Sequence, residues 1–182
     1  VLTGKVNPSG RLTETFPLSL CDVPSENAYR DEAVMLYSEG LNVGYRYFDT
    51  FRVPVLFPFG YGLSYSEFEY GDLSIERNGA RVTVRFTIEN VSDTDGKEVA
   101  QVYVREITKE VYRPNKELKA FRKVFVRAHE KATVVMELDE SAFAYYSVAK
   151  DRWTVKPGVF EIIIAANVQE EKLSRRICYG GN

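Results

Sequence analysis

The stretch RVTVRFTIE, at residues 81–89, alternates apolar and polar side chains with a period of two. Successive side chains of a strand point to opposite faces, so this stretch predicts a strand with one apolar face. The same alternation recurs at residues 132–138, 160–166 and 173–177. The side chains expected to face one way are Val82, Val84, Phe86 and Ile88; Ala132, Val134, Met136 and Leu138; Phe160, Ile162, Ile164 and Ala166; and Leu173 with Ile177.

Turn signals separate these stretches and indicate how they are joined. The segments 78–79 (NG), 94–96 (TDG) and 156–158 (KPG) contain the residue types that favour tight turns. Residues 99–104 are apolar on both faces apart from Gln101, which is typical of a central strand. Short alternating strands joined by turns predict a mainly β fold, with an antiparallel sandwich from about residue 67 onward.

The region before this sandwich, residues 40–70, has a different character. Ten aromatic residues lie between Tyr45 and Tyr70, interleaved with glycine and proline. These breakers argue against a helix, and the aromatic content argues against a solvated linker. We therefore expect strands or irregular structure, packed as a connector between two folded bodies. Residues 25–39 show only weak helical character.

Composition excludes several classes of function. Hydrophobic residues make up 45% and charged residues 27% of the 182 residues, and the net charge is −2. The sequence lacks the basic stripe that would indicate a nucleic-acid partner. No apolar run approaches the roughly 20 residues that span a bilayer. Cys21 and Cys178 are expected to be free thiols, and one histidine, His129, makes no recognisable metal site. We expect no cofactor and no metal.

Several polar residues and one tryptophan have simple structural interpretations. Asp93 and Asp95 are expected to serve a turn, as aspartate often does, and His129 to lie in an exposed loop. Trp153 is expected in the core or at the edge of the sandwich. The cations at the start of the strand near residue 120 predict a basic edge, which discourages sheet-to-sheet aggregation. They are Lys116, Lys119, Arg122, Lys123 and Arg127.

Four ordered blocks of the sequence resemble glycoside hydrolase family 3, the β-glucosidase and β-xylosidase family. They are GKVNPSGRLTETFP (residues 4–17), SEGLNVGYRYFD (38–49), LFPFGYGLSYSEFEY (56–70) and RPNKELKAFRKVFV (113–126). The first departs from the family pattern at Thr13, where proline is usual. The resemblance implies two parts: residues 1–66 as the tail of an α/β sandwich domain plus connector, and residues 67–182 as an immunoglobulin or fibronectin type III-like domain.

The resemblance also implies what the chain lacks. Family 3 enzymes hydrolyse glycosides with retention, which needs two carboxyl groups about 5–5.5 Å apart. In the family the nucleophile belongs to an N-terminal barrel, and the acid/base lies upstream of the block at residues 4–17. We therefore expect no catalytic residue here. The expected partners are the N-terminal catalytic domains of the same polypeptide. Because the chain starts at Val1, inside a family block, the sequence does not indicate whether the protein is cytoplasmic or secreted.

The connector contains the residues that we expect to join the domains: Tyr45, Arg46, Tyr47, Asp49, Phe57, Phe59, Tyr61 and Tyr65. We expect Asp49 to pair with Arg46, three residues earlier, in an ion pair that locks the connector; the alternative is a role of Asp49 near the sugar site. The aromatic residues are expected to be buried, since aromatics dominate cores and interfaces. The alternative is a carbohydrate-binding module, with a sugar platform formed by Tyr45, Tyr47, Phe48, Phe51 and Trp153. An apolar connector of this kind also predicts self-association of the chain.

Overall fold

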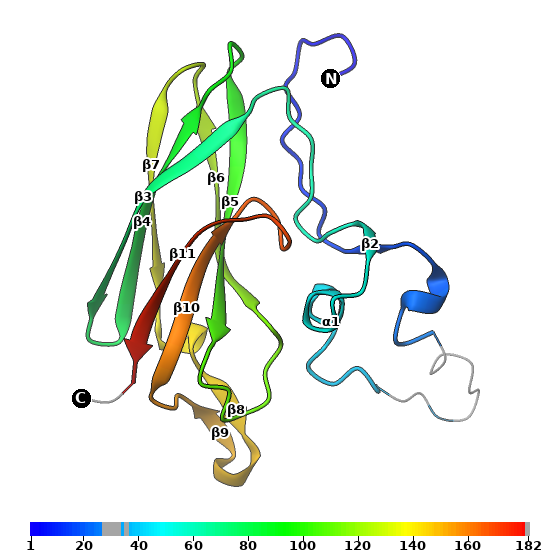
Figure 1. Cartoon of the computed structure of the whole chain (residues 1–182), viewed down its shortest axis with the longest axis vertical. Coiled ribbons are helices and arrows are strands. Elements are labelled where there is room, and N and C mark those ends of the chain that lie inside the picture. The colour runs from blue at the N-terminus through cyan, green and yellow to red at the C-terminus, as the bar shows by residue number, and fades with distance from the viewer. Residues whose placement is uncertain (27–33, 35–36, 181–182) are drawn as a thin grey trace.

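Two antiparallel sheets, packed face to face, make up most of the computed structural model, which describes residues 1–26, 34 and 37–180 (Figure 1). The three-stranded sheet has the order β3-β4-β7, with bounds Phe68–Asn78, Arg81–Asn90 and Lys131–Leu138. The four-stranded sheet has the order β11-β10-β5-β6, with bounds Glu171–Tyr179, Gly158–Ala165, Gly96–Glu106 and Glu117–Val126. The fold is therefore mainly β and an antiparallel sandwich, as the alternating stretches predicted.

The core lies between the two sheets and contains most of the side chains expected to face inward. Val82, Val84, Phe86 and Ile88 of β4 are all completely buried. They meet Val102, Ile162 and Ile164 among others from the opposite sheet. Leu173 and Ile177 are only partly buried against this core, and Ala166 lies just beyond the end of β10. The turn at residues 78–79 joins β3 to β4, with Gly79 at φ 60°.

The central strands of the larger sheet are buried on both faces. Val102 faces the core between the sheets, whereas Tyr103 belongs to a second cluster on the outer face. Ile163 and Ala165 of β10 join Tyr103 there, and all three are completely buried. The prediction that residues 99–104 form a central strand is therefore confirmed, because the connector covers the face that would otherwise meet water.

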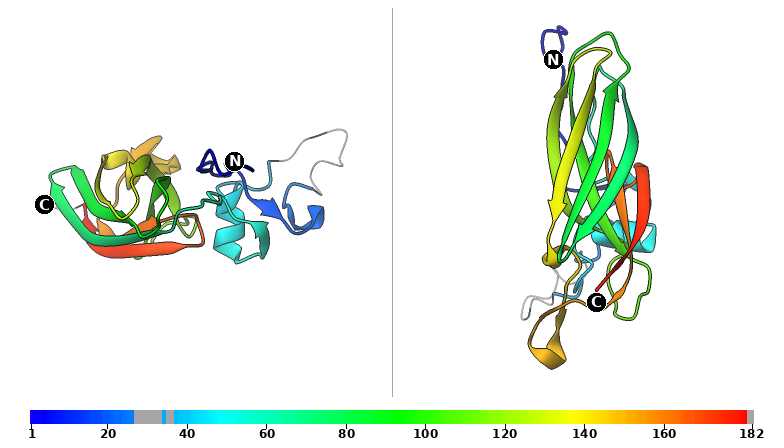
Figure 2. Two further views of the ribbon diagram at one scale, coloured as in Figure 1. Left: turned by 90° about the horizontal axis from the view of Figure 1, so that it is seen from above. Right: turned by 90° about the vertical axis from the view of Figure 1, so that its left-hand side faces the viewer.

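The connector forms a lobe beside the outer face of the larger sheet (Figures 1 and 2). The connector contains the helix α1 and the strand β2, with bounds Tyr45–Phe51 and Val55–Phe57. The N-terminal segment beside it contains the strand β1, which pairs with β2, and the turn η1, with bounds Phe16–Pro17 and Leu20–Asp22. The turns η3 and η4 and the paired strands β8 and β9 extend from one end of the sandwich (Figure 2), with bounds Glu140–Ala142, Val148–Lys150, Tyr145–Ser147 and Arg152–Thr154.

The prediction of a helix-free connector is wrong at α1. The seven residues of α1 contain neither glycine nor proline, and the breakers bound the helix instead of interrupting it. Gly44 precedes the helix at φ 59°, and Arg52 ends it in the left-handed conformation. The weak helical character expected at residues 25–39 falls largely outside the described residues. Within the described part of the chain, no helix has the length and apolar character to cross a bilayer.

Candidate interdomain interface

Tyr45, the first residue of α1, connects the connector to the outer face of the larger sheet. Its ring stacks on Phe59 with 4.6 Å between centroids and meets Tyr103 edge-on at 6.2 Å. Its hydroxyl accepts a hydrogen bond of 2.8 Å from the Leu118 backbone N–H. Each aromatic pair of this kind contributes about 0.5–1.5 kcal/mol beyond its buried area. Tyr45 and Phe59 therefore dock the connector onto the sandwich.

The backbone around Gly60 holds the connector against both the sandwich and the N-terminal segment. The Phe59 carbonyl accepts from the Val168 N–H at 3.0 Å, and the Gly60 N–H donates to the Leu12 carbonyl at 2.8 Å. Gly60 has φ 81°, and a Cβ there would lie 2.5 Å from the Gln101 side-chain amide. Gln101 is itself buried and donates to the Ala166 carbonyl at 2.8 Å. Only glycine fits this position without a shift of its neighbours.

The expected Asp49–Arg46 pair is wrong. The Asp49 carboxylate instead lies 3.3 Å from the Lys116 ammonium and accepts 2.8 Å from the Asn115 side-chain amide. Arg46 instead lies 3.0 Å from the Glu117 carboxylate. Adjacent residues of an extended segment project to opposite sides, so Lys116 and Glu117 meet different groups of α1. Asp49 therefore links α1 to the segment just before β6, through partners that the sequence did not predict.

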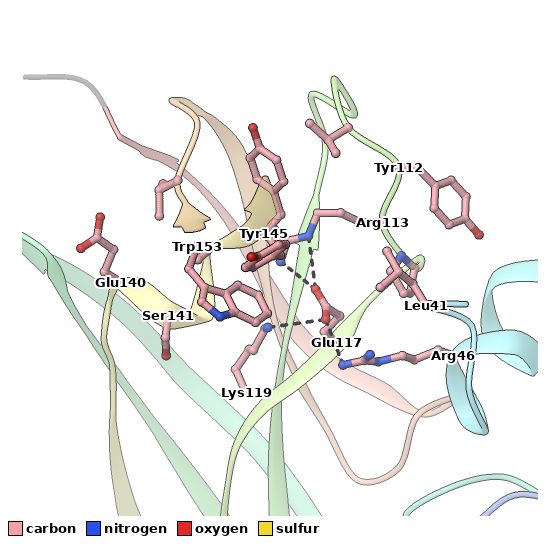
Figure 3. A pocket seen from close by; sticks show the side chains of 15 residues that line it. Leu41, Arg46, Tyr112, Arg113, Glu117, Lys119, Glu140, Ser141, Tyr145 and Trp153 are labelled. Atoms are coloured by element: carbon pink, nitrogen blue, oxygen red, sulfur yellow. Dashed lines mark hydrogen bonds and ion pairs between the residues drawn. The ribbon is translucent and has the colours of Figure 1, made fainter. Parts of the chain in front are cut away.

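Glu117 is the carboxylate on which three cations converge (Figure 3). Its oxygens lie 3.0 Å from Arg46, 2.7 Å from Arg113 and 3.6 Å from Lys119. Burial alone would raise the pKa of Glu117, but Lys119, Arg113 and Arg46 together hold it below its ordinary value. Burial lowers the pKa of Lys119, and the Glu117 charge only partly offsets this.

The lowered pKa of Glu117 predicts a loss of stability in acid. A carboxylate whose pKa is lower in the folded state stabilises the fold above its unfolded pKa, and this contribution disappears as pH falls through the folded pKa. We expect Glu117→Gln to be less stable than the parent at neutral pH and to converge with it well below pH 4.5, the ordinary value. Thermal unfolding from pH 7 to pH 3 measures this; Glu137→Gln, an exposed carboxylate on β7, is the control. A constant gap between Glu117→Gln and the parent across this range contradicts it.

The remaining connector aromatics contact one another or the N-terminal segment. Phe57 packs on Tyr61 with centroids 5.0 Å apart, and Tyr47 packs against Phe51 at 5.2 Å. Tyr65 donates its hydroxyl to the Val1 carbonyl at 2.9 Å and is half exposed. The expected burial of the connector aromatics therefore does not extend to Phe57, Phe51 and Tyr65, which are exposed in this chain.

Sequence reasoning missed a second group of polar contacts beneath the connector. Arg11 donates to the Gly62 carbonyl at 2.6 Å and pairs with the buried Glu98 carboxylate. Tyr70 donates to the same carboxylate at 2.9 Å, and burial raises the pKa of its hydroxyl. Asn7 donates to Ser66 at 2.8 Å. Asn7 and Arg11 both belong to the block at residues 4–17, and this block was the feature of the sequence that could have indicated these contacts.

The other sequence predictions have mixed outcomes. Cys21 and Cys178 are free and exposed, and His129 occupies an exposed turn at φ 58°, 2.8 Å from Asp93. Trp153 was expected in the core or at the edge of the sandwich, but it lies on β9, outside both sheets of the sandwich, with 70% of its surface exposed. Among the described residues, no group of three or more His, Cys, Asp or Glu side chains is placed to hold a metal ion.

The predicted basic edge needs one correction. β6 is an edge strand of the larger sheet, as expected. Lys116, however, precedes β6 and is only 3% exposed, with Glu171 at 2.6 Å and Asp49 at 3.3 Å. The nearby Lys116 and Arg105 charges hold the pKa of Glu171 below its ordinary value, against the rise that burial alone would cause. Lys116 is thus a buried cation under α1 and not a charge of the edge.

Comparison with known proteins gives matches along nearly the whole chain. The model of the glycosyl hydrolase family 3 C-terminal domain matches residues 1–65, and that of the fibronectin type III-like domain matches residues 98–168. Thermostable beta-glucosidase B of Acetivibrio thermocellus is 43% identical over 182 residues, covering 97% of this chain and 24% of that protein. An exo-alpha-(1->6)-L-arabinopyranosidase of Bifidobacterium longum is 42% identical, covering 93% of this chain and 23% of that protein.

Solved structures agree with these sequence matches. Beta-glucosidase 3B from Thermotoga neapolitana, in complex with alpha-D-glucose, superposes with a TM-score of 0.94 at 38% identity, over 100% of this chain and 26% of that one. A beta-glucosidase of Bifidobacterium adolescentis also gives a TM-score of 0.94, at 39% identity, over 98% of this chain and 27% of that one. The chain therefore spans about a quarter of the length of the relatives that it matches.

Proposed function

Because the chain belongs to glycoside hydrolase family 3, as its C-terminal fibronectin type III-like module, we propose that it holds the catalytic domains of a β-glucosidase-type hydrolase together. In this proposal residues 1–66 complete an α/β sandwich domain and carry the connector, and residues 67–182 form the supporting sandwich. The partners are the catalytic domains of the same polypeptide.

The observation that carries the proposal is the two-sided character of the connector. Its inner side is docked on the sandwich through Tyr45 and Phe59, as described above. Its other side leaves large apolar side chains exposed, with Leu56 at 56% and Phe57 at 37%. Contiguous exposed apolar surface on a folded chain marks an interaction site. Other exposed apolar residues of the connector and of the N-terminal segment beside it are Phe16, Leu18, Leu20, Val43, Phe51 and Leu63.

The chemistry proposed for the whole protein is hydrolysis of O-glycosyl bonds with retention, by two carboxyl groups about 5–5.5 Å apart. These carboxyl groups are proposed to lie on polypeptide other than these 182 residues. The relatives named above include beta-glucosidases and an arabinopyranosidase, so the proposal stops at the class of terminal glycosides. The exposed side of the connector would also let the separate chain self-associate.

A single substitution on this side tests the proposal in the full-length protein. We expect Leu56→Ser to weaken docking of the catalytic domains by about 2 kcal/mol, the scale of burying one leucine side chain. Calorimetry should then show two unfolding transitions where the parent shows one, and an aryl β-glucoside assay should show a shorter half-life on heating. In the separate 182-residue chain the same change should leave thermal stability unaltered.

The matched control is Val148→Ser. Val148 is also exposed, at 86%, but lies on η4, between β8 and β9, and not on the connector. It should leave both the number of transitions and the half-life unchanged. A Leu56→Ser enzyme that unfolds in one transition at the parent temperature would show that this side of the connector does not hold the domains.

A further inference from the structure

A hollow of about 580 Å³ lies where α1, the loop between β5 and β6, and the β8–β9 hairpin come together (Figure 3). This volume falls within the roughly 300–1,000 Å³ of small-molecule sites. The hollow is separate from the outer face of the connector, since Leu41 and Arg46 are the only connector residues among its described walls. The side chains that matter for its chemistry are Arg46, Arg113, Glu117, Lys119, Tyr146 and Trp153.

One wall of the hollow is an exposed aromatic ring held in position. Trp153 on β9 is 70% exposed and meets Tyr146 of β8 edge-on, with centroids 5.8 Å apart and planes at 80°. Tyr146 in turn donates its hydroxyl to the Asp151 carboxylate. These contacts hold the indole while leaving much of its surface open. An indole presented in this way offers a flat apolar surface to a ligand.

The opposite wall is polar and contains both donors and acceptors. Arg46, Arg113 and Lys119 surround Glu117, and Glu106 lies 3.7 Å from Arg113, so three cations meet two carboxylates. Arg113 uses its donors on Glu117, the Phe143 carbonyl and Glu106, whereas Arg46 contacts Glu117 through one Nη atom, so further N–H donors of Arg46 remain for a ligand. An entirely apolar occupant would leave the remaining donors of Arg46 and Lys119 without hydrogen-bond partners, which is costly.

We propose that this hollow binds a neutral sugar ring, as part of an oligosaccharide, with one face on Trp153 and its hydroxyls on the Glu117 cluster. A pyranose has an apolar C–H face and an edge of hydroxyls that both donate and accept, which matches the two walls. Because the cations and carboxylates nearly balance, the hollow suits a neutral ligand better than an anion. The inference does not depend on the docking role of the connector.

The chain contains a single tryptophan, so a change in tryptophan fluorescence would report ligand binding at Trp153. We expect cellotriose, laminaritriose or xylotriose to change the Trp153 fluorescence of the 182-residue chain saturably, with a Kd of about 1 mM. Cyclohexanol, an apolar ring with one hydroxyl, serves as the comparison probe. Saturable binding of cyclohexanol but of no trisaccharide would show an apolar docking pocket and overturn the proposal, as would no saturable change with any probe.

Two variants locate the binding. Lys119→Met should weaken trisaccharide binding about tenfold in the fluorescence titration, whereas Lys150→Met, an exposed lysine of the same end of the sandwich that does not line the hollow, should not. Trp153→Ala should abolish the saturation-transfer NMR signal of the trisaccharide. Thermal unfolding confirms that each variant is folded, and Trp153→Ala changes only an exposed side chain. Unchanged affinity in both Lys119→Met and Trp153→Ala would place the sugar elsewhere and refute the site.

Discussion

Gly60→Ala should destabilise the docked connector by about 3 kcal/mol, because two costs add at one position. The backbone has φ 81°, a conformation that residues with a Cβ adopt at a cost of about 1–2 kcal/mol. The new Cβ would also lie 2.5 Å from the Gln101 amide. Gln101 is buried and bonded to the Ala166 carbonyl at 2.8 Å, so it has little room to retreat. Forcing extra atoms into a packed site costs about 1–3 kcal/mol more.

Hydrogen exchange separates detachment of the connector from unfolding of the sandwich. The Val168 N–H donates to the Phe59 carbonyl and should lose most of its protection in Gly60→Ala. Amides of β4, in the middle of the smaller sheet, should exchange at nearly the parent rate. Equal loss of protection in both places would mean that Gly60 supports the whole sandwich and not the docking of the connector.

Gly79→Ala is the matched control for the conformational cost. Gly79 has φ 60° in the hairpin between β3 and β4, but a Cβ there would have no atom within 4 Å. It should therefore cost only the strain of the backbone, about 1–2 kcal/mol. If Gly60→Ala and Gly79→Ala lower the melting temperature equally, the contact with Gln101 contributes nothing.

The strands of the sandwich were predictable because the pattern that indicates each strand lies within the residues of that strand. A period of two in RVTVRFTIE places Val82, Val84 and Phe86 on one face whatever the rest of the chain does. Residues 99–104 indicated burial on both faces, and the structure has Val102 in the core and Tyr103 under the connector. Neither pattern required knowledge of distant residues.

The connector was less predictable because its structure depends on distant contacts. Glycine and proline near α1 were interpreted as interruptions, whereas Gly44 and Arg52 bound a short helix that also packs on the sandwich through Tyr45. Local charge spacing suggested an Asp49–Arg46 pair. The partners actually used are Lys116 and Glu117, which lie more than sixty residues away in the sequence.

The sequence patterns failed to predict which of these side chains are exposed to solvent. Lys116 appeared in a run of cations typical of an exposed edge, but α1 covers it. Trp153 was expected in the core or at the edge of the sandwich, but it lies on a hairpin that extends beyond the two sheets (Figure 2). In both cases the outcome depends on which segment lies over the residue, and a single stretch of sequence does not contain that information.

Lys116→Met should destabilise the chain by about 3–5 kcal/mol, the cost of removing one partner from a buried ion pair. Lys116 is 3% exposed, and its ammonium lies 2.6 Å from Glu171 and 3.3 Å from Asp49. Glu171 is partly exposed and keeps Arg105 at 2.7 Å, so its charge remains compensated. The Asp49 carboxylate is left between α1 and the sandwich with only the Asn115 amide as a donor among the contacts described here. Thermal and urea unfolding measure the loss.

The control for removal of a paired lysine is Lys156→Met. Lys156 lies 2.9 Å from Glu110, but both side chains are exposed, and surface pairs contribute about 0–1 kcal/mol. Lys116→Met should therefore cost several times more than Lys156→Met. Equal costs would show that burial under α1 does not strengthen the dependence on Lys116.

The double variant Asp49→Asn with Lys116→Met identifies the source of the cost. If the penalty comes mainly from an uncompensated carboxylate under α1, neutralising Asp49 should recover a large part of the stability lost in Lys116→Met. Asparagine retains an oxygen that can accept from the Asn115 amide, now 2.8 Å from the carboxylate. If the penalty comes instead from lost packing of the lysine stem, methionine already replaces most of that volume and the second substitution recovers nothing. A recovery in the double variant, with Asp49→Asn alone destabilising, would establish that the charge pair between α1 and the start of β6 fixes the connector on the sandwich.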